Sequence, residues 1–467
     1  MQPFLGPDFL LSTDTARQLF HTYAEGMPLF DYHCHLSAKE IWEDKPFDNL
    51  GRLWLEHDHY KWRVMRASGV PEQLVTGSAS WHDKFLSFAR ILPGAVGNPV
   101  YHWSHLELSR YFHIQEPLDA SNAEKIWEKS SEIIRAEGFS PRHLIAISDV
   151  QTLCTTEDPA DTLAYHQKLA ETGWKVRVLP AWRPDKVVKV EKGGFASYLQ
   201  ELSKAAGIPI HDYHSLWEVL GRRMDAFDAT GCVASDHDVT TLGGRVLSDG
   251  EMDALLQKKL DGAGLCAEEV AGWKTTMMVA LARQYARRGW VMELHIGCER
   301  DQNARGVGIA GEAAGFDSVG DGQVARPLGS FLNRLEATGE LPKTVLFCLN
   351  PKDNWVLAAL ANTFQDDSIP GKIQFGTAWW FQDHIPGMRM QMESYTTSGV
   401  LANFIGMLSD SRSYLSYPRF EYFRRILCSY IGGLVESGQY PDDIEYLGNM
   451  VREICFGNAR RFFQKSR

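Results

Sequence analysis

The chain has 467 residues, of which 44% are hydrophobic, and its net charge at pH 7 is −11. This composition excludes wholesale disorder, and an acidic balance without a Lys/Arg block argues against nucleic acid and anionic membranes as partners. No run of about 18 apolar residues predicts a membrane helix, and the lack of basic residues before Arg17 argues against a secretory signal. The eight cysteines include no C-x-x-C pair, so we expect a cytoplasmic protein without disulfides.

Short apolar runs of strand-like composition recur along the chain and alternate with helix-like segments. Because the runs are continuously apolar and end in polar residues, we expect parallel strands that are buried on both faces. Three of the helix-like segments, 162–173, 275–290 and 388–400, have a Gly near their end, where a helix cap needs positive φ. The eight strand-like runs are residues 29–35, 149–158, 174–185, 231–238, 290–297, 343–350, 372–380 and 403–412.

Eight β/α units in this order predict an α/β fold of the TIM type, a (β/α)8 barrel. An open, doubly wound sheet has the same local pattern, but reactive residue types at the end of nearly every run favour the barrel. A long, mostly helical segment with a Gly-Asn-Pro break at 97–99 separates the first two runs. We therefore expect a barrel built from residues 1–36 and 141–467, with residues 37–140 inserted as a helical subdomain that caps the barrel mouth.

A His-x-His pair ends the first run. His33 and His35 lie two residues apart on a strand, so they point to the same face and both imidazoles can reach one metal ion. Further ligands should come from other strand ends, where His295 of the fifth run and Asp410 of the eighth are suitable types. This nitrogen and oxygen ligand set predicts one divalent ion, with zinc as the best candidate.

Three other segments carry residues suited to a binding site, and each also has a structural interpretation. Residues 57–63, which include His59 and Tyr60, predict either a site wall or a solvated helix face. Arg183 ends the third run, where it forms either a carboxylate clamp or a salt bridge at the rim. Trp379 and its neighbour end the seventh run, where they face either a sugar or the core.

Two motifs have misleading forms. Residues 306–311 satisfy G-x-G-x-x-G, but they do not directly follow a strand and they lead into a segment that is not helical, so a dinucleotide site is rejected. Residues 236–238 (Asp-His-Asp) resemble a metal cluster, although polar contacts at the rim are the favoured interpretation. The sequence contains neither a Walker A motif nor H-E-x-x-H.

Several segments spread along the chain together resemble the uronate isomerase (glucuronate isomerase) family. The resemblance is collinear from Asp8 to Arg461, and it implies a metal-dependent (β/α)8 barrel of the amidohydrolase superfamily. It also implies an aldose–ketose isomerase that interconverts D-glucuronate with D-fructuronate, and D-galacturonate with D-tagaturonate, in hexuronate catabolism. The segments are FDYHCHL, DHYKWRVMR, NPVYHWSHLEL, LPAWRPDK, HIGCERDQN, LNPKDN, FGTAWWFQD and LSDSRSYLSYPRFEYFRRILC.

The resemblance implies roles for particular residues at the ends of the strands. His33 and His35 match the metal pair of the family, and Asp410 matches the Asp of the eighth strand. His295 matches a third active-site His near the metal, and Arg183 matches a substrate-binding Arg. We therefore expect these five residues to meet at one site.

The resemblance also places residues around that centre. His59 and Tyr60 match a catalytic pair carried by the insertion, Trp379 matches an aromatic neighbour, and Arg412 matches the Arg two residues after Asp410. In one respect the chain departs from the wider superfamily: its sixth run ends without a His, and no lysine of the fourth run offers itself as a bridging ligand. A single ion is therefore expected in place of a two-metal centre.

The chemistry of an aldose–ketose isomerase fits these residue types. A base must move a proton from C2 to C1 through an enediolate, and Asp410 is the best candidate for it. Tyr60 and Arg412 suit the hydroxyl proton and the developing charge, while Arg183 holds a substrate anion. A hydride shift is the competing route, and two roles stay open for the ion: it polarises the reacting carbonyl, or it grips the carboxylate.

Two functions from other classes use the same residues. A metal-dependent hydrolase would keep His33, His35, His295 and Asp410 and would activate water. A non-catalytic uronate-binding protein would keep only the arginines. In each case the partner is a small molecule, and we expect a homo-oligomer.

Overall fold

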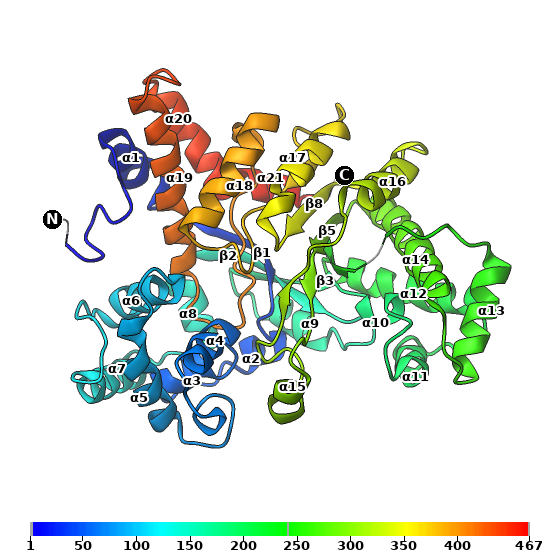
Figure 1. Cartoon of the computed structure of the whole chain (residues 1–467), viewed down its shortest axis with the longest axis horizontal. Coiled ribbons are helices and arrows are strands. Elements are labelled where there is room, and N and C mark those ends of the chain that lie inside the picture. Colours follow the sequence, from blue (N-terminus) through cyan, green and yellow to red (C-terminus); the bar gives the residue numbers. More distant parts are fainter. Residues whose placement is uncertain (1–2, 241, 466–467) are drawn as a thin grey trace.

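The computed structural model describes residues 3–240 and 242–465. In these ranges, one curved sheet of seven parallel strands runs in the order β1-β2-β3-β4-β5-β8-β9, with helices around it (Figure 1). The strands form where the sequence predicts continuous apolar runs. Every residue of β1, β5 and β8 is buried. They are β1 (Leu29–Cys34), β2 (Val150–Glu157), β3 (Arg177–Trp182), β4 (Ala234–Val239), β5 (Val291–Ile296), β8 (Thr344–Cys348) and β9 (Ile373–Phe375).

The eighth predicted strand, at residues 403–412, is not formed. Gly406 and Asp410 adopt φ angles of 73° and 47°, so the extended backbone is interrupted twice and a regular ladder cannot form. The segment still lies beside β1, where the N–H of Asp410 donates to the carbonyl oxygen of His33 (3.0 Å). The described residues thus form a curved parallel sheet of seven strands with an irregular segment along β1, and closure into an eight-stranded barrel stays a prediction.

Asp31 links β1 to this irregular segment. The carboxylate is fully buried, and it accepts hydrogen bonds from the main-chain nitrogen (2.8 Å) and the hydroxyl (2.6 Å) of Ser409. Burial raises the pKa of Asp31 to about 7, against the opposing effect of these two donors. This buried carboxylate, with its hydrogen bonds satisfied, therefore joins β1 to the irregular segment.

The three predicted helices are present, and two of them end as expected. They are α9 (Ala164–Glu171), α14 (Ala267–Arg288) and α18 (Ile385–Ser398). Gly173 and Gly289, which follow the first two, have φ angles of 68° and 66°. The same prediction is wrong for Gly399, which is extended at φ −131°; its N–H still closes the helix by donating to Tyr395 O (2.8 Å).

The segment between β1 and β2 is mostly helical, as predicted, and its helices gather on one side of the sheet (lower left in Figure 1). At the Gly-Asn-Pro break, the side chain of Asn98 caps α6 by accepting from Val100 N (3.0 Å), and Pro99 takes the first helical position, which needs no N–H. The predicted boundaries at 37 and 140 stay a prediction. The helices are α2 (Ala38–Glu43), α3 (Leu50–Leu55), α4 (His59–Ala67), η2 (Glu72–Leu74), α5 (Trp81–Ile91), η3 (Leu92–Gly94), α6 (Pro99–Phe112), α7 (Ala123–Glu137) and α8 (Pro141–Ile147).

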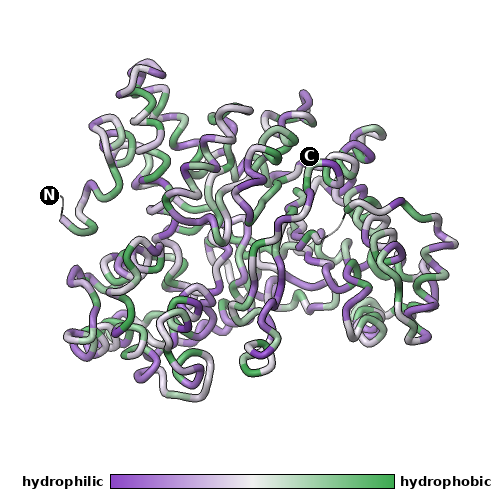
Figure 2. The backbone as a smooth tube through the Cα atoms, viewed as in Figure 1, coloured by the Kyte–Doolittle hydropathy of each residue, from purple (hydrophilic) through white to green (hydrophobic). Residues whose placement is uncertain are grey.

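Other helices cover the outside of the sheet. Hydrophobic and hydrophilic residues alternate along them (Figure 2), as in amphipathic helices that pack one face on a core. Within the described ranges, no helix is long and apolar enough to cross a membrane. These elements are α1 (Asp14–Leu19), η1 (Phe20–Ala24), α10 (Asp185–Val188), α11 (Phe195–Ala206), α12 (Tyr213–Ala229), α13 (Asp249–Leu260), α16 (Ala325–Glu336), η4 (Pro351–Asp353), α17 (Asn354–Thr363), η5 (Leu401–Asn403), α19 (Pro418–Glu436), α20 (Ile444–Arg452), η6 (Glu453–Gly457) and α21 (Asn458–Phe462).

The last turns of the chain close the amino end of the sheet. Phe456, Phe462 and Phe463 belong to one buried cluster with Tyr32 of β1. Phe463 stacks on Tyr32 with 4.9 Å between the ring centroids. We call residues 456–463 the C-terminal plug, because their aromatic side chains pack on β1 at this end of the sheet, beside a cavity that Phe456 and Phe463 also line.

Candidate active site

A cavity of about 470 Å³ lies at the carboxyl ends of the strands, the edge at which α/β sheets bind their ligands. Most of the residues that the sequence predicts for the site line this cavity: His33, His35, His59, Arg183, His295, Trp379, Asp410 and Arg412. Tyr60 lines a small second cavity that also contacts His59, Asp410 and Arg412. The structure therefore brings all nine predicted residues into one region.

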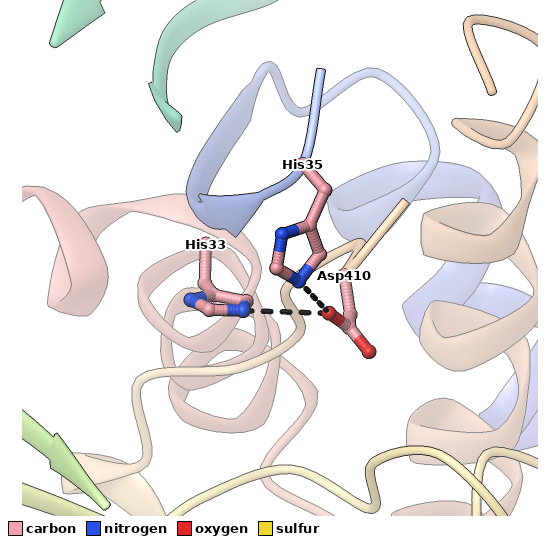
Figure 3. A group of neighbouring side chains, drawn as sticks. All are labelled: His33, His35 and Asp410. Atoms are coloured by element: carbon pink, nitrogen blue, oxygen red, sulfur yellow. Dashed lines mark ion pairs between the residues drawn. The ribbon is translucent and has the colours of Figure 1, made fainter. Parts of the chain in front are cut away.

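His33, His35 and Asp410 form the centre of the region (Figure 3). Strand β1 carries His33 and ends at Cys34, so His35 follows on the same side, as the two-residue spacing predicts. Nε2 of His33 lies 3.3 Å, and Nε2 of His35 3.1 Å, from the same carboxylate oxygen, Oδ1 of Asp410. Trp379 Nε1 donates to the other oxygen, Oδ2 (2.7 Å). Two imidazoles and a carboxylate that converge in this way can hold a divalent metal ion.

Glu293 completes the surroundings of His33, and sequence reasoning missed it. Its Oε2 lies 3.0 Å from His33 Nδ1, and both side chains are buried. A carboxylate at Nδ1 keeps the proton on that nitrogen and leaves Nε2 free for a metal ion, which is the usual arrangement behind metal-binding histidines. Burial raises the pKa of Glu293 to about 7. The sequence does contain a signal for Glu293, because a carboxylate in the centre of an apolar strand needs a buried partner.

The charges around the two imidazoles suit a bound cation. Burial lowers the pKa of His33, but nearby carboxylates, Asp236 foremost, outweigh burial and raise that pKa well above its usual range. Burial and then Arg412 lower the pKa of His35 to about 3. Burial would raise the pKa of Asp410, but the hydrogen bonds from the two imidazoles hold it well below its usual range. His35 is therefore neutral beside an ionised carboxylate, the state that metal binding requires, whereas the carboxylates around His33 favour a positive charge there, which a bound cation would supply.

Asp236 and His295 form a second possible ligand group that shares His33. Nδ1 of His295 lies 2.7 Å from Asp236 Oδ1, and its buried Nε2 has no hydrogen-bond partner in the described part of the chain. Asp236 on β4 is fully buried and accepts from Arg183 Nη1 (2.6 Å). The interpretation of residues 236–238 as rim contacts is therefore wrong for Asp236. Both possible ligand groups include His33.

The arginines of the cavity differ in their pairing. Arg183 donates through Nη1 to Asp236 and through Nε to Asp185 (3.1 Å), so two carboxylates balance its charge. The guanidinium of Arg412 forms no hydrogen bond or ion pair with another side chain of the described residues, and it faces the same cavity. Burial lowers the pKa of Arg412, although Asp410 opposes this effect. Arg412 is therefore the cation with the most donors left for a ligand.

Helix α4 brings His59 and Tyr60 to the cavity. Asp58 is the N-cap of this helix, and its Oδ1 accepts from Tyr60 N (2.9 Å) and Lys61 N (3.2 Å), so the helix begins at the residue that faces the site. The ring of His59 lies between those of Tyr60 (4.8 Å) and Trp380 (4.9 Å). Burial and then Arg412 lower the pKa of His59 to about 3, so its imidazole is neutral.

An unpredicted projection between β5 and β8 lies along the cavity. It consists of the antiparallel pair β6 (Cys298–Glu299) and β7 (Ser318–Val319) with helix α15 (Ala304–Ala310) between them. Arg63 of α4 ties the projection to the insertion by donating through Nη1 to the carbonyl oxygen of Gly315 (3.1 Å). Gly306 of the G-x-G-x-x-G motif packs on Phe316, since a Cβ there would lie 2.5 Å from the ring. Gly306 is therefore needed for close packing on Phe316.

Comparison with known proteins points to one family. The family model of glucuronate isomerase matches residues 1–463. The chain is 46% identical to a uronate isomerase of Halalkalibacterium halodurans, over 99% of this chain and 98% of that protein. It is 48% identical to one of Salmonella heidelberg, over 99% of each. The solved structure of a uronate isomerase of Thermotoga maritima has 33% identity and a TM-score of 0.94, over 99% of this chain and 100% of that one.

Proposed function

The chain belongs to the glucuronate isomerase family, and on that premise we propose that it converts D-glucuronate to D-fructuronate by proton transfer through an enediolate. The protein is an isomerase of hexuronate catabolism. Within that activity, we propose that D-galacturonate and D-tagaturonate form a second substrate pair. The observation that carries the mechanism is the convergence of Asp410, Arg412 and Tyr60 at one cavity.

Asp410 is the proposed base for the carbon-bound proton. It is ionised at neutral pH, and its position next to two imidazoles and an indole N–H restrains the carboxylate. Each carboxylate oxygen has two lone pairs, so contacts with these neighbours leave room for a further proton. Proton transfer from C2 to this carboxylate, and then to C1, moves the carbonyl from C1 to C2.

Cationic and hydroxyl groups complete the reaction. The guanidinium of Arg412, which has no side-chain partner among the described residues, is proposed to stabilise the enediolate oxygens, because charge develops on them only in the transition state. Arg183 is proposed to hold a substrate anion with the N–H groups that its two carboxylate partners leave free. Tyr60 is proposed to take the hydroxyl proton, with His59 as its aromatic neighbour and Trp379 orienting the base.

The residues present fit a divalent ion, for which we propose zinc. His33 and His35 with Asp410 would hold it, with Glu293 behind His33 and the unpartnered Nε2 of His295 nearby. When bound, such an ion supplies electrophilic stabilisation of a ligand oxygen. We also propose one ion per chain, because the two possible ligand groups share a histidine.

Several architectural proposals accompany this function. Residues 404–411 are proposed to take the place of the eighth strand, so that the sheet has the topology of a (β/α)8 barrel. Residues 37–140 are proposed to form a subdomain that caps the site, since α4 carries Tyr60 into it. A homo-oligomer that works in the cytoplasm remains our proposal for the assembly and its location.

The test is incubation of the purified protein with D-glucuronate and detection of D-fructuronate by NMR. In D₂O, we expect deuterium at C1 of the product in one stereochemical position, because the base exchanges its proton with solvent. Complete retention of the C2 hydrogen over many turnovers would favour a hydride shift. A metal-dependent hydrolase would consume other substrates without forming the ketose, and a uronate-binding protein would bind D-glucuronate without turnover.

A further inference from the structure

We propose that Asp383 is a positioning residue for the isomerisation, which holds Tyr60 in place and stores the hydroxyl proton that Tyr60 takes from the substrate. The inference rests on the proposed proton transfer through an enediolate. Asp383 lies in the turn before α18, and 323 residues separate it from Tyr60 in the chain. Neither the apolar pattern nor the family resemblance drew attention to this carboxylate.

The geometry of the pair assigns the direction of its hydrogen bond. Tyr60 Oη lies 2.6 Å from Asp383 Oδ2, a length typical of a hydroxyl that donates to an ionised carboxylate. Asp383 is buried and lines neither of the two cavities of the site. Because the proton of Tyr60 is directed to Asp383, the lone pairs of the phenol oxygen stay available as acceptors, and Tyr60 lines the same small cavity as Asp410 and Arg412. Tyr60 is thus arranged to accept a proton from a ligand hydroxyl.

This arrangement matches the proton balance of the reaction. An aldose–ketose isomerisation removes a proton from O2 and adds one to O1. In the first half, the O2–H bond breaks as a new O–H bond forms on Tyr60, while the original Tyr60 O–H bond breaks and an O–H bond forms on Asp383. In the second half, Asp383 returns its proton to Tyr60 and Tyr60 gives one to O1. No proton is gained or lost overall, and Asp383 never touches the substrate.

The charged groups around Asp383 and Tyr60 allow Asp383 to hold a proton during the reaction. Burial raises the pKa of Asp383 to about 6, against the hydrogen bond from Tyr60 and the charge of Arg419, while Asp410 adds to the rise. The Arg419 guanidinium lies 5.2 Å from the ring centroid of Tyr60. Burial and then the charge of Asp383 raise the pKa of Tyr422 on α19. A carboxylate that titrates near neutral pH can accept and release a proton in each turnover.

The test is a double-mutant cycle. Asp383→Asn keeps the size of the side chain and an acceptor oxygen for Tyr60, but it cannot store a proton, so kcat should fall at least about tenfold with KM within about twofold. Tyr60→Phe should lower kcat at least as much, and the double variant should be no slower than Tyr60→Phe, because the residues of one relay act as a unit. Asp353→Asn, which removes another buried carboxylate outside the site, is the control and should change kcat less than about twofold.

A second measurement separates proton storage from structural support. The wild-type kcat should fall below about pH 6 as Asp383 becomes protonated, and this acidic limb should disappear in Asp383→Asn. Tyr60→Phe, which leaves the carboxylate in place, should lose the same limb and so tests the relay even if Asp383→Asn does not fold. Additive losses in the cycle, or an acidic limb that persists in both variants, would overturn the inference. Absence of isomerisation by the wild-type protein would instead overturn the proposed function.

Discussion

The two ends of the central sheet are built on opposite principles. At the amino end, the C-terminal plug stacks aromatic rings on β1, and a broad cavity of about 1000 Å³ between residues such as Phe30, Lys175 and Phe463 adjoins it. At the carboxyl end, the cavity is about half as large, yet both possible metal-ligand groups found among the described residues lie there. The volume of a cavity therefore does not identify the functional site. The convergence of buried titratable groups with free donors and acceptors does.

The difference also separates stability from activity. Apolar packing at the amino end should stabilise the fold without touching the reaction, whereas the carboxyl end keeps charged and unpartnered groups that an ordinary core would not retain. Substitutions at the two ends should therefore have different signatures. The predictions below test this separation, in order of the expected effect on activity.

The largest effect is expected from removal of the imidazole pair. The double variant His33→Asn, His35→Asn should lose the divalent ion and all isomerase activity, because two of three convergent donors are gone. Metal analysis of the purified proteins checks this, with His82→Asn on the insertion as the control. Two tightly bound ions in the wild type, or full metal content in the double variant, would contradict a single site.

Asp410→Asn should lower kcat at least about 100-fold, the usual range for loss of a general base. Asn also tolerates the positive φ at this position, so the thermal unfolding temperature should change little. Steady-state kinetics and calorimetry on the same preparation check both parts. Near-normal kcat would move the role of base to Tyr60 or His59.

Arg412→Met and Arg183→Met should each lower kcat/KM at least about tenfold, but only the second should also destabilise the protein. The charge of Arg412 has no side-chain partner among the described residues, whereas loss of Arg183 leaves the fully buried Asp236 without its cation, which costs roughly 3 kcal/mol of unfolding free energy. Kinetics combined with chemical unfolding measure the two effects. Arg183→Lys, which restores a charge, should recover part of the stability. Equal stability of both Met variants would show that the Arg183–Asp236 pair is not a structural ion pair.

The smallest effect on activity is expected at the amino end. Phe463→Ala removes the ring that stacks on Tyr32 and should lower the unfolding free energy by about 3 kcal/mol, while kcat at 25 °C stays within about twofold of the wild type. Unfolding curves and kinetics of the variant check this. A large loss of kcat without loss of stability would mean that the two ends are coupled through the sheet.

The sequence predicts most of the sheet because its strands are buried on both faces and therefore read as apolar runs. It fails at residues 403–412, where the apolar character is present but Gly406 and Asp410 break the backbone with positive φ. A long-range contact also requires glycine at position 406, because a Cβ there would lie 2.2 Å from the carbonyl oxygen of Ile454. Periodicity contains no information about that contact.

The nine predicted site residues come together at the carboxyl end, but three carboxylates that support them were undervalued or missed. Asp236, Glu293 and Asp383 act through contacts with residues from other elements, and their partners are 53 to 323 residues away in the chain. A buried carboxylate can be suspected from an acidic residue in an apolar strand, as for Glu293. Which histidine, arginine or tyrosine it serves depends on tertiary packing.

The contact between Asp31 and Ser409 has a consequence for the timing of synthesis. The two residues are 378 positions apart, so at a translation rate of about 5–20 residues per second a nascent chain waits roughly 20–75 s before the partner of Asp31 is made. During that interval β1 has one free edge, and the buried carboxylate has no donor. The sheet of each new polypeptide therefore stays incomplete until Ser409, about seven-eighths of the way along the 467 residues, has been synthesised.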